Sequence, residues 1–180
     1  MEPRIKPVEH PKGIFNRIMY ASLTRQFGKV ITPAKVIYAR YPKIGLMVKK
    51  LHSVRDSLNK ITSEETLLIQ SLVATLNGCT FCIDISKRKA LGKDMIMKKF
   101  SHLQDYGTVD LFSEREKAIF SFVEEMTKQL TISDENYDSL KIHCSDDEII
   151  EITYIASAEN FLNRMLKPLQ IGSDELCAIR

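Results

Sequence analysis

The chain has 180 residues, 44% of them hydrophobic, so it can bury a sizeable core without a disulfide or a metal to hold it together. Its 26 basic and 23 acidic residues leave a net charge of only +3, which gives no broad attraction for nucleic acid. No stretch has the pattern of a signal peptide or a membrane span. We expect a cytoplasmic protein with one domain over residues 1–180 that binds neither nucleic acid nor membrane.

Helical periodicity dominates the chain, and alternating strand patterns are scarce, so the sequence predicts an all-α protein. Residues 1–13 are rich in proline and charge, which predicts an extended N-terminal arm. Three helices are expected after the arm, the last with a basic outer face: Ile14 to Gln26, Ala34 to Tyr41, and Leu46 to Leu58.

The next predicted helix begins at a capping box, in which Thr62 is followed three residues later by Glu65. Glu65 is therefore interpreted as a cap rather than a catalyst. The strongly apolar pattern runs to Asn77, and Gly78 is predicted to end the helix because glycine adopts the left-handed conformation of a C-cap readily.

Cys79 and Cys82 follow directly, and helical spacing resumes as far as Gly92, so the two cysteines are predicted to open a new helix. At this spacing two thiols can close and open a disulfide. The positive end of a helix dipole also favours a thiolate. The pattern therefore indicates thiol redox chemistry, and the helix-terminus argument alone favours Cys79 as the more exposed nucleophile.

Two other interpretations of the pair are weaker. Cysteine is also a small hydrophobic residue of protein cores, and CxxC is half of many zinc sites. A structural zinc needs about four ligands, whereas the remaining candidates, His143, Cys144 and Cys177, form no second CxxC or HxxxH motif. The glycines never approach GxGxxG, so we predict neither a metal nor a flavin, haem or nicotinamide cofactor.

The second half of the chain predicts three more helices and a tail. One begins at Asp94 as its cap and ends at Lys99 or Phe100, and a loop from about His102 to Phe112 follows. Two further capping boxes each begin a long helix: Ser113 with Glu116, and Ser145 with Glu148. Residues 168–180 form a C-terminal tail. The last helix carries a polar cluster that can be a site or an interface, and its members are Glu159, Asn160, Asn163 and Arg164.

The run from Leu67 to Gly92, with its Asn-Gly-Cys and Thr-Phe-Cys, resembles the CxxC-containing branch of the carboxymuconolactone decarboxylase and alkylhydroperoxidase D superfamily. The blocks 113–118, 145–151, 158–164 and 171–174 are similar to recurring blocks in that branch. The resemblance implies an AhpD-like antiparallel helical bundle that assembles as a homo-oligomer, a trimer or a hexamer, with the cysteines near subunit boundaries.

The resemblance also implies an activity. In peroxidase members one cysteine attacks the peroxide and the other resolves the sulfenic acid as a disulfide. By this match Cys82 is the attacking residue and Cys79 the resolving one. The expected function is a thiol-dependent peroxidase, an antioxidant protein that reduces hydroperoxides and is regenerated by an external dithiol, either a reductant protein or a small thiol.

The chain departs from the pattern at the proton relay. Peroxidase members usually carry a histidine four residues after the second cysteine and a glutamate twelve residues before the first, where this chain has Ser86 and Leu67. Three acids are candidates to replace the relay: Asp84, Glu64 and Glu159. Asp84 can equally be a first-turn residue that stabilises the helix dipole, and Ser86 can bond the sulfur or the backbone carbonyl of Cys82.

Two alternative functions remain open. The first is a disulfide exchanger or redox sensor that turns over peroxide poorly, which the missing histidine and glutamate favour. The second is a lactone decarboxylase like the members that give the superfamily its name. Those members do not need a CxxC, so the intact Cys79 and Cys82 pair argues against the second alternative.

Overall fold

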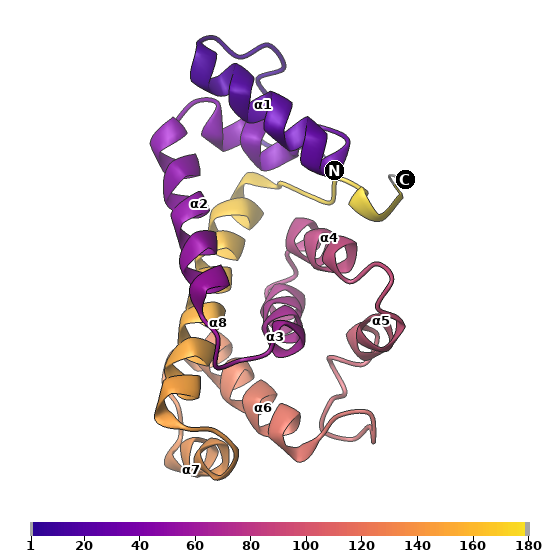
Figure 1. Cartoon of the computed structure of the whole chain (residues 1–180), viewed down its shortest axis with the longest axis vertical. Helices are drawn as coiled ribbons and strands as arrows, with labels where there is room; N and C mark the ends of the chain where they lie inside the picture. Colours follow the sequence, from indigo (N-terminus) through magenta and orange to yellow (C-terminus); the bar gives the residue numbers. More distant parts are fainter. Residues whose placement is uncertain (1, 179–180) are drawn as a thin grey trace.

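The structure, a computed structural model, describes residues 2–178; the ends of the expected arm and tail, residues 1 and 179–180, lie outside the described residues. The described chain is all-α and contains no β-strand, as predicted. Its main helices are α1 (Ile14–Phe27), α2 (Pro42–Ser57), α3 (Ser63–Leu76), α4 (Thr80–Lys89), α5 (Asp94–Phe100), α6 (Glu114–Gln129), α7 (Asp134–His143) and α8 (Asp146–Leu166) (Figure 1). A π-helix (Ala34–Tyr38) and two short 3-10 turns (Lys167–Leu169 and Leu176–Ala178) complete them.

The three predicted capping boxes are all present. Thr62, Ser113 and Ser145 each accept a hydrogen bond from the backbone N–H three residues on, and the glutamate at that position accepts one from the backbone of the capping residue. Two N–H groups that the first turn leaves unpaired are satisfied at each helix start. The boxes therefore set the beginnings of α3, α6 and α8.

Arg115 on α6 ties these helix ends together. Its Nε donates to Glu65 Oε1 over 2.7 Å and its Nη2 donates to Glu148 Oε1 over 2.8 Å. Its Nη1 donates to the carbonyl of His143, at the end of α7, over 2.5 Å. One partly buried guanidinium thus joins two capping boxes and a helix C-terminus, which holds α3, α7 and α8 around α6.

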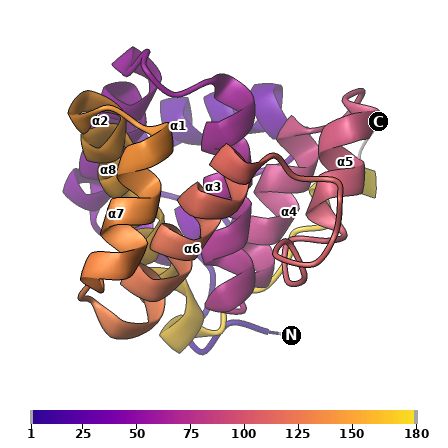
Figure 2. The ribbon, with the colours of Figure 1, turned by 90° about the horizontal axis from the view of Figure 1, so that it is seen from below.

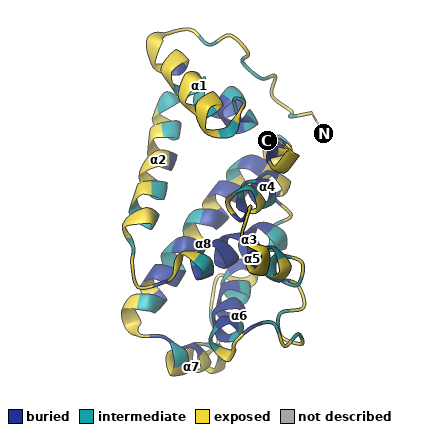
Figure 3. Cartoon of the chain, turned by 45° about the vertical axis from the view of Figure 1, so that its right-hand side comes forward, coloured by how far each residue is buried: buried dark blue, intermediate teal, exposed yellow. Residues whose placement is uncertain are grey.

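The larger core surrounds α3, which lies in the centre with α7 and α8 on one side and α4 and α5 on the other (Figure 2). Buried apolar side chains of α3 pack against those of α6 and α8, and α3, α6 and α8 are the most buried helices (Figure 3). The fully buried members include Leu68, Ile69, Leu72, Phe120, Ile152 and Ile155. The central position of α3 matters because its C-terminal end leads directly into the CxxC motif.

A second, smaller core lies between the N-terminal elements, α4 and the C-terminal segment. It contains buried side chains from the π-helix, from the end of α8 and from the tail, among them Ile37, Leu166 and Leu176, and it includes both Cys79 and Cys82. The arm lies against this region, with Arg4 N donating to Leu169 O and Val8 N donating to Lys35 O. The CxxC motif is thus enclosed by both ends of the chain.

Four details differ from the sequence-based expectations. The expected helix from Ala34 is a short π-helix, and α2 begins at Pro42, whose fixed φ suits a first helical turn, rather than at Leu46. Asp94 is the first residue of α5 and not its cap, which is Lys93. α7 was not expected at all.

No helix in the described part of the chain combines the length and the apolar character that crossing a bilayer requires.

Candidate functional site

The CxxC motif lies at the junction of α3 and α4. Gly78 ends α3 with a φ of +62°, as predicted, and Cys79 is the N-cap of α4. This positive φ favours glycine, because residues with a Cβ adopt it at a cost. Cys79 and Cys82 form a disulfide, with their Cα atoms 5.3 Å apart. The prediction that the cysteines open a helix is confirmed, although α4 ends at Lys89, a turn before Gly92.

Both cysteines are buried. Cys79 is 2% exposed and Cys82 is 6% exposed, so the expectation that Cys79 is the more exposed of the two is wrong. The reason is tertiary: the smaller core, including Ile37 of the π-helix and Leu176 of the tail, packs over the start of α4. Access from solvent to the sulfur atoms is therefore restricted.

Asn163 on α8 contacts the disulfide directly. Its Nδ2 donates one hydrogen bond to Cys82 Sγ over 3.1 Å and a second to Glu159 Oε1 over 2.7 Å. Asn163 is only 1% exposed, so this amide is a fixed donor at the sulfur. When Cys82 is reduced, an N–H at this position stabilises the thiolate in preference to the thiol.

Glu159 is the one acid of the three relay candidates that the structure brings to Cys82. It is buried on α8, and Gln70 Nε2 of α3 donates to its Oε2 over 3.2 Å. Burial raises the pKa of Glu159 above its usual value, while the hydrogen bond from Asn163 and the charge of Lys89 act in the opposite direction. A carboxyl group with these properties can hold or release a proton, and its hydrogen-bonded link to the sulfur passes through Asn163.

A further set of amides fixes the orientation of Asn163. Asn77, at the end of α3, donates through Nδ2 to Asn163 Oδ1 over 3.1 Å and to Asn160 Oδ1 over 2.9 Å. Arg164 Nη1 also donates to Asn160 Oδ1, over 2.6 Å. Since Asn163 Oδ1 accepts from Asn77, its Nδ2 must face Cys82 and Glu159. The polar cluster predicted on the last helix is therefore a hydrogen-bonded network that reaches the CxxC motif through Asn163.

Asp84 has a different set of contacts. It is buried on α4, where it accepts hydrogen bonds from Ser173 Oγ and Asp174 N, each over 2.9 Å, and from Leu176 N over 3.0 Å. Asp174 in turn accepts from Thr32 N over 2.7 Å, before the π-helix. The two aspartates thus hold the C-terminal segment across the smaller core that covers the disulfide.

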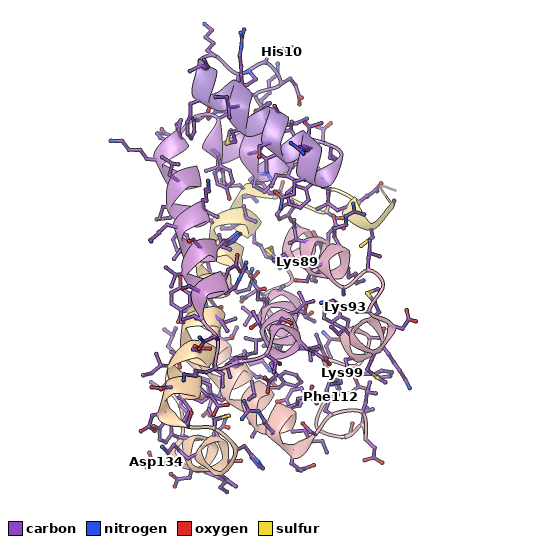
Figure 4. The ribbon with its side chains drawn as sticks, in the orientation of Figure 1. His10, Lys89, Lys93, Lys99, Phe112 and Asp134 are labelled. Atoms are coloured by element: carbon purple, nitrogen blue, oxygen red, sulfur yellow. A yellow bond between two sulfur atoms is a disulfide. The ribbon has the colours of Figure 1, made fainter. Side chains whose placement is uncertain are left out.

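The remaining predicted site residues lie elsewhere or make no bond to the sulfur atoms. Ser86 is buried on α4, but no hydrogen bond joins its side chain to Cys82 within the described structure. Glu64 lies in the first turn of α3, at the opposite end from the CxxC motif, where it accepts from Lys99 Nζ over 3.1 Å. Lys99 lies on α5 near Phe112, far from the start of α4 (Figure 4). The structure therefore does not bring Glu64 to the cysteines.

Sequence reasoning did not assign Asn163, Asn77 or Gln70 to the site. A signal existed, because polar residues recur at helical spacing within an otherwise apolar helix end, and Asn163 was noted in that cluster. What the spacing could not show is which of these side chains faces α4, because that depends on how α8 packs against α3.

Comparisons with known proteins agree with this architecture. No protein-family profile matches the chain. It is 26% identical over 122 residues to the uncharacterized protein YdfG of Bacillus subtilis, covering 67% of this chain and 81% of that protein. It is 24% identical over 160 residues to the uncharacterized protein YnjA of Escherichia coli, covering 86% of each.

Solved structures are similar to it as well. A putative antioxidant defence protein AhpD from Agrobacterium tumefaciens superposes with a TM-score of 0.70 at 22% identity, over 76% of this chain and 94% of that one. A peroxidase-related protein from a Silicibacter species has a TM-score of 0.80 at 17% identity, over 95% and 92%. The debrominase Bmp8 in complex with 2,3,4-tribromopyrrole has a TM-score of 0.78 at 19% identity, over 99% and 96%. The chain therefore has the AhpD-like fold, with a CxxC disulfide at the start of α4.

Proposed function

We propose that the chain is a thiol-dependent peroxidase that reduces hydroperoxides through a reversible Cys79–Cys82 disulfide. The observation that carries the proposal is the pair of hydrogen bonds from Asn163, one to Cys82 Sγ and one to the buried Glu159. The AhpD-like fold, which peroxidase-related proteins share, supports the same reaction class.

The proposed cycle begins with the Cys82 thiolate, which attacks the distal oxygen of a hydroperoxide. The O–O bond breaks, Cys82 becomes a sulfenic acid, and the alkoxide takes a proton to leave as an alcohol. The Cys79 thiol then attacks the Cys82 sulfur, a disulfide forms and water leaves. An external dithiol reduces the disulfide to two thiols and is itself oxidised to a disulfide, which closes the cycle.

In this proposal Asn163 and Glu159 take the place of the histidine and glutamate of peroxidase members. Asn163 stabilises the thiolate of Cys82 by donating to it, and Glu159 keeps the amide in that orientation by accepting its second N–H. The N-terminus of α4 adds its positive dipole end, because Cys82 lies in the first turn. In this proposal Asp84 anchors the C-terminal segment, and neither Ser86 nor Glu64 takes part in the chemistry.

Self-association is part of the proposal. Large apolar side chains are exposed on the N-terminal helices: Ile14 is 79% exposed, Ile18 63% and Leu46 50%. These helices also contribute to the core that covers the cysteines. We expect a homo-oligomer, a trimer or a hexamer, whose mass light scattering will give directly.

The experiment measures consumption of cumene hydroperoxide with dithiothreitol as the donor. Cys82→Ser should abolish turnover, while Cys79→Ser should stop after one equivalent of peroxide and leave a sulfenic acid on Cys82 that dimedone traps for mass mapping. Cys144→Ser and Cys177→Ser are the matched controls and should retain activity, since neither residue is in the disulfide. Turnover that survives in both Cys79→Ser and Cys82→Ser would refute the proposal.

Disulfide exchange without peroxide turnover is the second candidate, because Ser86 and Leu67 occupy the positions where peroxidase members carry the histidine and glutamate of the proton relay. In that case the protein would exchange its disulfide with a dithiol and leave cumene hydroperoxide unconsumed.

Because the fold of Bmp8 aligns with 99% of this chain, 2,3,4-tribromopyrrole belongs in the same assay. Debromination without peroxide consumption would move the assignment away from a peroxidase.

A further inference from the structure

A surface cleft of about 460 Å³ opens between the end of α2, α3 and the end of α4, separate from the cover of the disulfide. Its volume falls within the range of small-molecule sites, about 300–1,000 Å³. Three cationic side chains from three parts of the chain line it: Arg55 of α2, Lys89 of α4 and Lys93 of the following turn. Lys89 and Lys93 lie close to α3, near the end of α4 (Figure 4).

The positive charge of the cleft is only partly neutralised. Within the described structure neither Lys89 nor Lys93 forms an ion pair; Asp56, 65% exposed, is the acid on the cleft wall, and the buried Glu159 behind it interacts with the charges of Lys89 and Arg55. Arg55 uses Nε and Nη2 to bond Asp56. Its side chain is 11% exposed, and its Nη1 makes no hydrogen bond to a described residue. The guanidinium of Arg55, held in place by Asp56, and the exposed ammonium groups of Lys89 and Lys93 therefore remain available to an anion.

Desolvation and neighbouring charges together shift the protonation of the groups around the cleft. Desolvation and the charge of Arg55 lower the pKa of Lys89, while the charges of Glu159 and Asp56 act in the opposite direction. Burial, Arg55 and Lys89 lower the pKa of His52 to about 4, so His52 is neutral near pH 7. An anion in the cleft would relieve the repulsion between Arg55 and Lys89.

The rest of the cleft wall contains both apolar and polar side chains. Leu58, which is partly buried, supplies hydrocarbon surface, while Ile61 and Leu67 are 6% and 5% exposed and reach the cleft only with the edges of their side chains. All three belong to or pack against the larger core. Gln70 lines the cleft and donates to Glu159. A ligand that matches this wall has a compact negative charge at one end and a hydrocarbon part at the other.

We propose that this cleft binds a small amphiphilic organic acid, with the carboxylate held by Arg55, Lys89 and Lys93 and the hydrocarbon part against Leu58, Ile61 and Leu67. The inference goes beyond the peroxidase proposal, because binding requires no turnover. The cleft also has a connection to the thiol site: Gln70 bonds Glu159, Glu159 bonds Asn163, and Asn163 bonds Cys82. A bound acid lies at the outer end of that chain of hydrogen bonds.

The test is calorimetric titration of the whole protein with octanoate at low ionic strength, with 1-octanol and inorganic phosphate as comparison ligands. Octanoate should bind at least about tenfold more tightly than either, since each lacks one half of the proposed contacts. Lys89→Gln and Lys93→Gln should each weaken octanoate binding about tenfold, and raising the salt concentration should weaken binding to the unchanged protein.

Lys87→Gln is the matched control, because Lys87 is exposed on the same helix and is absent from the cleft wall. It should leave the dissociation constant unchanged. Equal affinity for octanoate and 1-octanol, or equal effects of Lys87→Gln and Lys89→Gln, would refute the carboxylate subsite. Phosphate binding as tight as octanoate binding would refute the hydrocarbon contact, and the absence of octanoate binding would refute the site. These outcomes are independent of cumene hydroperoxide turnover, which tests the proposed function separately.

Discussion

Asn163 donates a hydrogen bond to Cys82 Sγ over 3.1 Å although the two residues are 81 positions apart in the chain. The second N–H of the same amide is held by Glu159 Oε1, and the amide oxygen is held by Asn77. Every hydrogen-bonding atom of the Asn163 side chain therefore has a partner, and the donor at the sulfur cannot rotate away without breaking the others.

Replacement of Asn163 by alanine should raise the pKa of the Cys82 thiol. A hydrogen bond to a charged group contributes about 1.5–3 kcal/mol, so we expect the rate of peroxide reduction near neutral pH to fall by about tenfold or more. The measurement is the pH dependence of iodoacetamide alkylation of Cys82 in a Cys79→Ser background. Asn136→Ala is the control, because Asn136 lies on α7, where it bonds Glu125. An unchanged alkylation profile for Asn163→Ala would remove Asn163 from the thiolate site.

Glu159 should make stability depend on pH. Burial raises its pKa in the folded state, so its contribution to stability is fully present below about pH 4.5 and is lost as the pH rises through the raised value. The glutamine of Glu159→Gln does not ionise, so the variant does not lose stability in this way. Its stability relative to the unchanged protein should therefore increase as the pH rises from about 4 towards neutrality. Urea unfolding over this range measures the difference, with the exposed Glu135→Gln as the control. A difference that does not vary with pH would contradict the assignment.

Asp84→Asn should loosen the C-terminal segment. The asparagine replaces one of the two accepting oxygens by an NH₂ group, which cannot accept, and removes the charge that Ser173, Asp174 and Leu176 donate to, so we expect a loss of about 1–3 kcal/mol in stability. Hydrogen exchange of the tail amides should speed up, and dithiothreitol should reduce the Cys79–Cys82 disulfide faster because its cover opens. The exposed Asp138→Asn is the control. If Asp84→Asn slows peroxide reduction while tail exchange and disulfide reduction are unchanged, Asp84 acts in proton transfer instead.

Arg115→Met should destabilise the fold near neutral pH. Burial opposes the ionisation of Glu65, but hydrogen bonds from Arg115 and Thr62 hold the pKa of Glu65 below its usual value. A depressed pKa contributes stability that is present above about pH 4.5 and lost as the pH falls through the folded value. We expect a loss of about 2–4 kcal/mol at pH 7.

That loss should shrink as the pH falls through the lowered folded-state pKa of Glu65, and urea unfolding at a series of pH values from about 7 downwards tests this. The exposed Arg17→Met on α1 is the control and should have little effect at any pH of the series. A destabilisation by Arg115→Met that stays constant over the whole series would mean that packing, rather than the ion pairs, accounts for it.

Local sequence signals predicted much of the fold. The capping residues Thr62, Ser113 and Ser145 predicted where α3, α6 and α8 begin, since each box is a short-range interaction that needs no tertiary partner. α7 was missed because its cap, Ser133, is followed three residues later by Asn136 rather than glutamate, and only Leu140 in the helix is buried. Its helical state depends on packing against α6, which local patterns do not report.

The candidate site was predicted only in part. The CxxC motif and the polar cluster on α8 were visible because each is a local pattern. The role of Asp84 was not, because its partners Ser173, Asp174 and Leu176 are about 90 residues away. No spacing rule links residues that only the folding of the tail onto α4 brings together. Likewise, the contact of Asn163 with Cys82 depends on the relative placement of α8 and α4.

The central claim is best tested by adding cumene hydroperoxide to the reduced protein, mapping the resulting disulfide by mass spectrometry, and then following peroxide consumption with dithiothreitol. The account predicts a Cys79–Cys82 bond formed in proportion to peroxide and sustained turnover that ends when the dithiol is exhausted. A protein whose cysteines stay reduced in the presence of peroxide, or whose disulfide forms without any turnover, would contradict it.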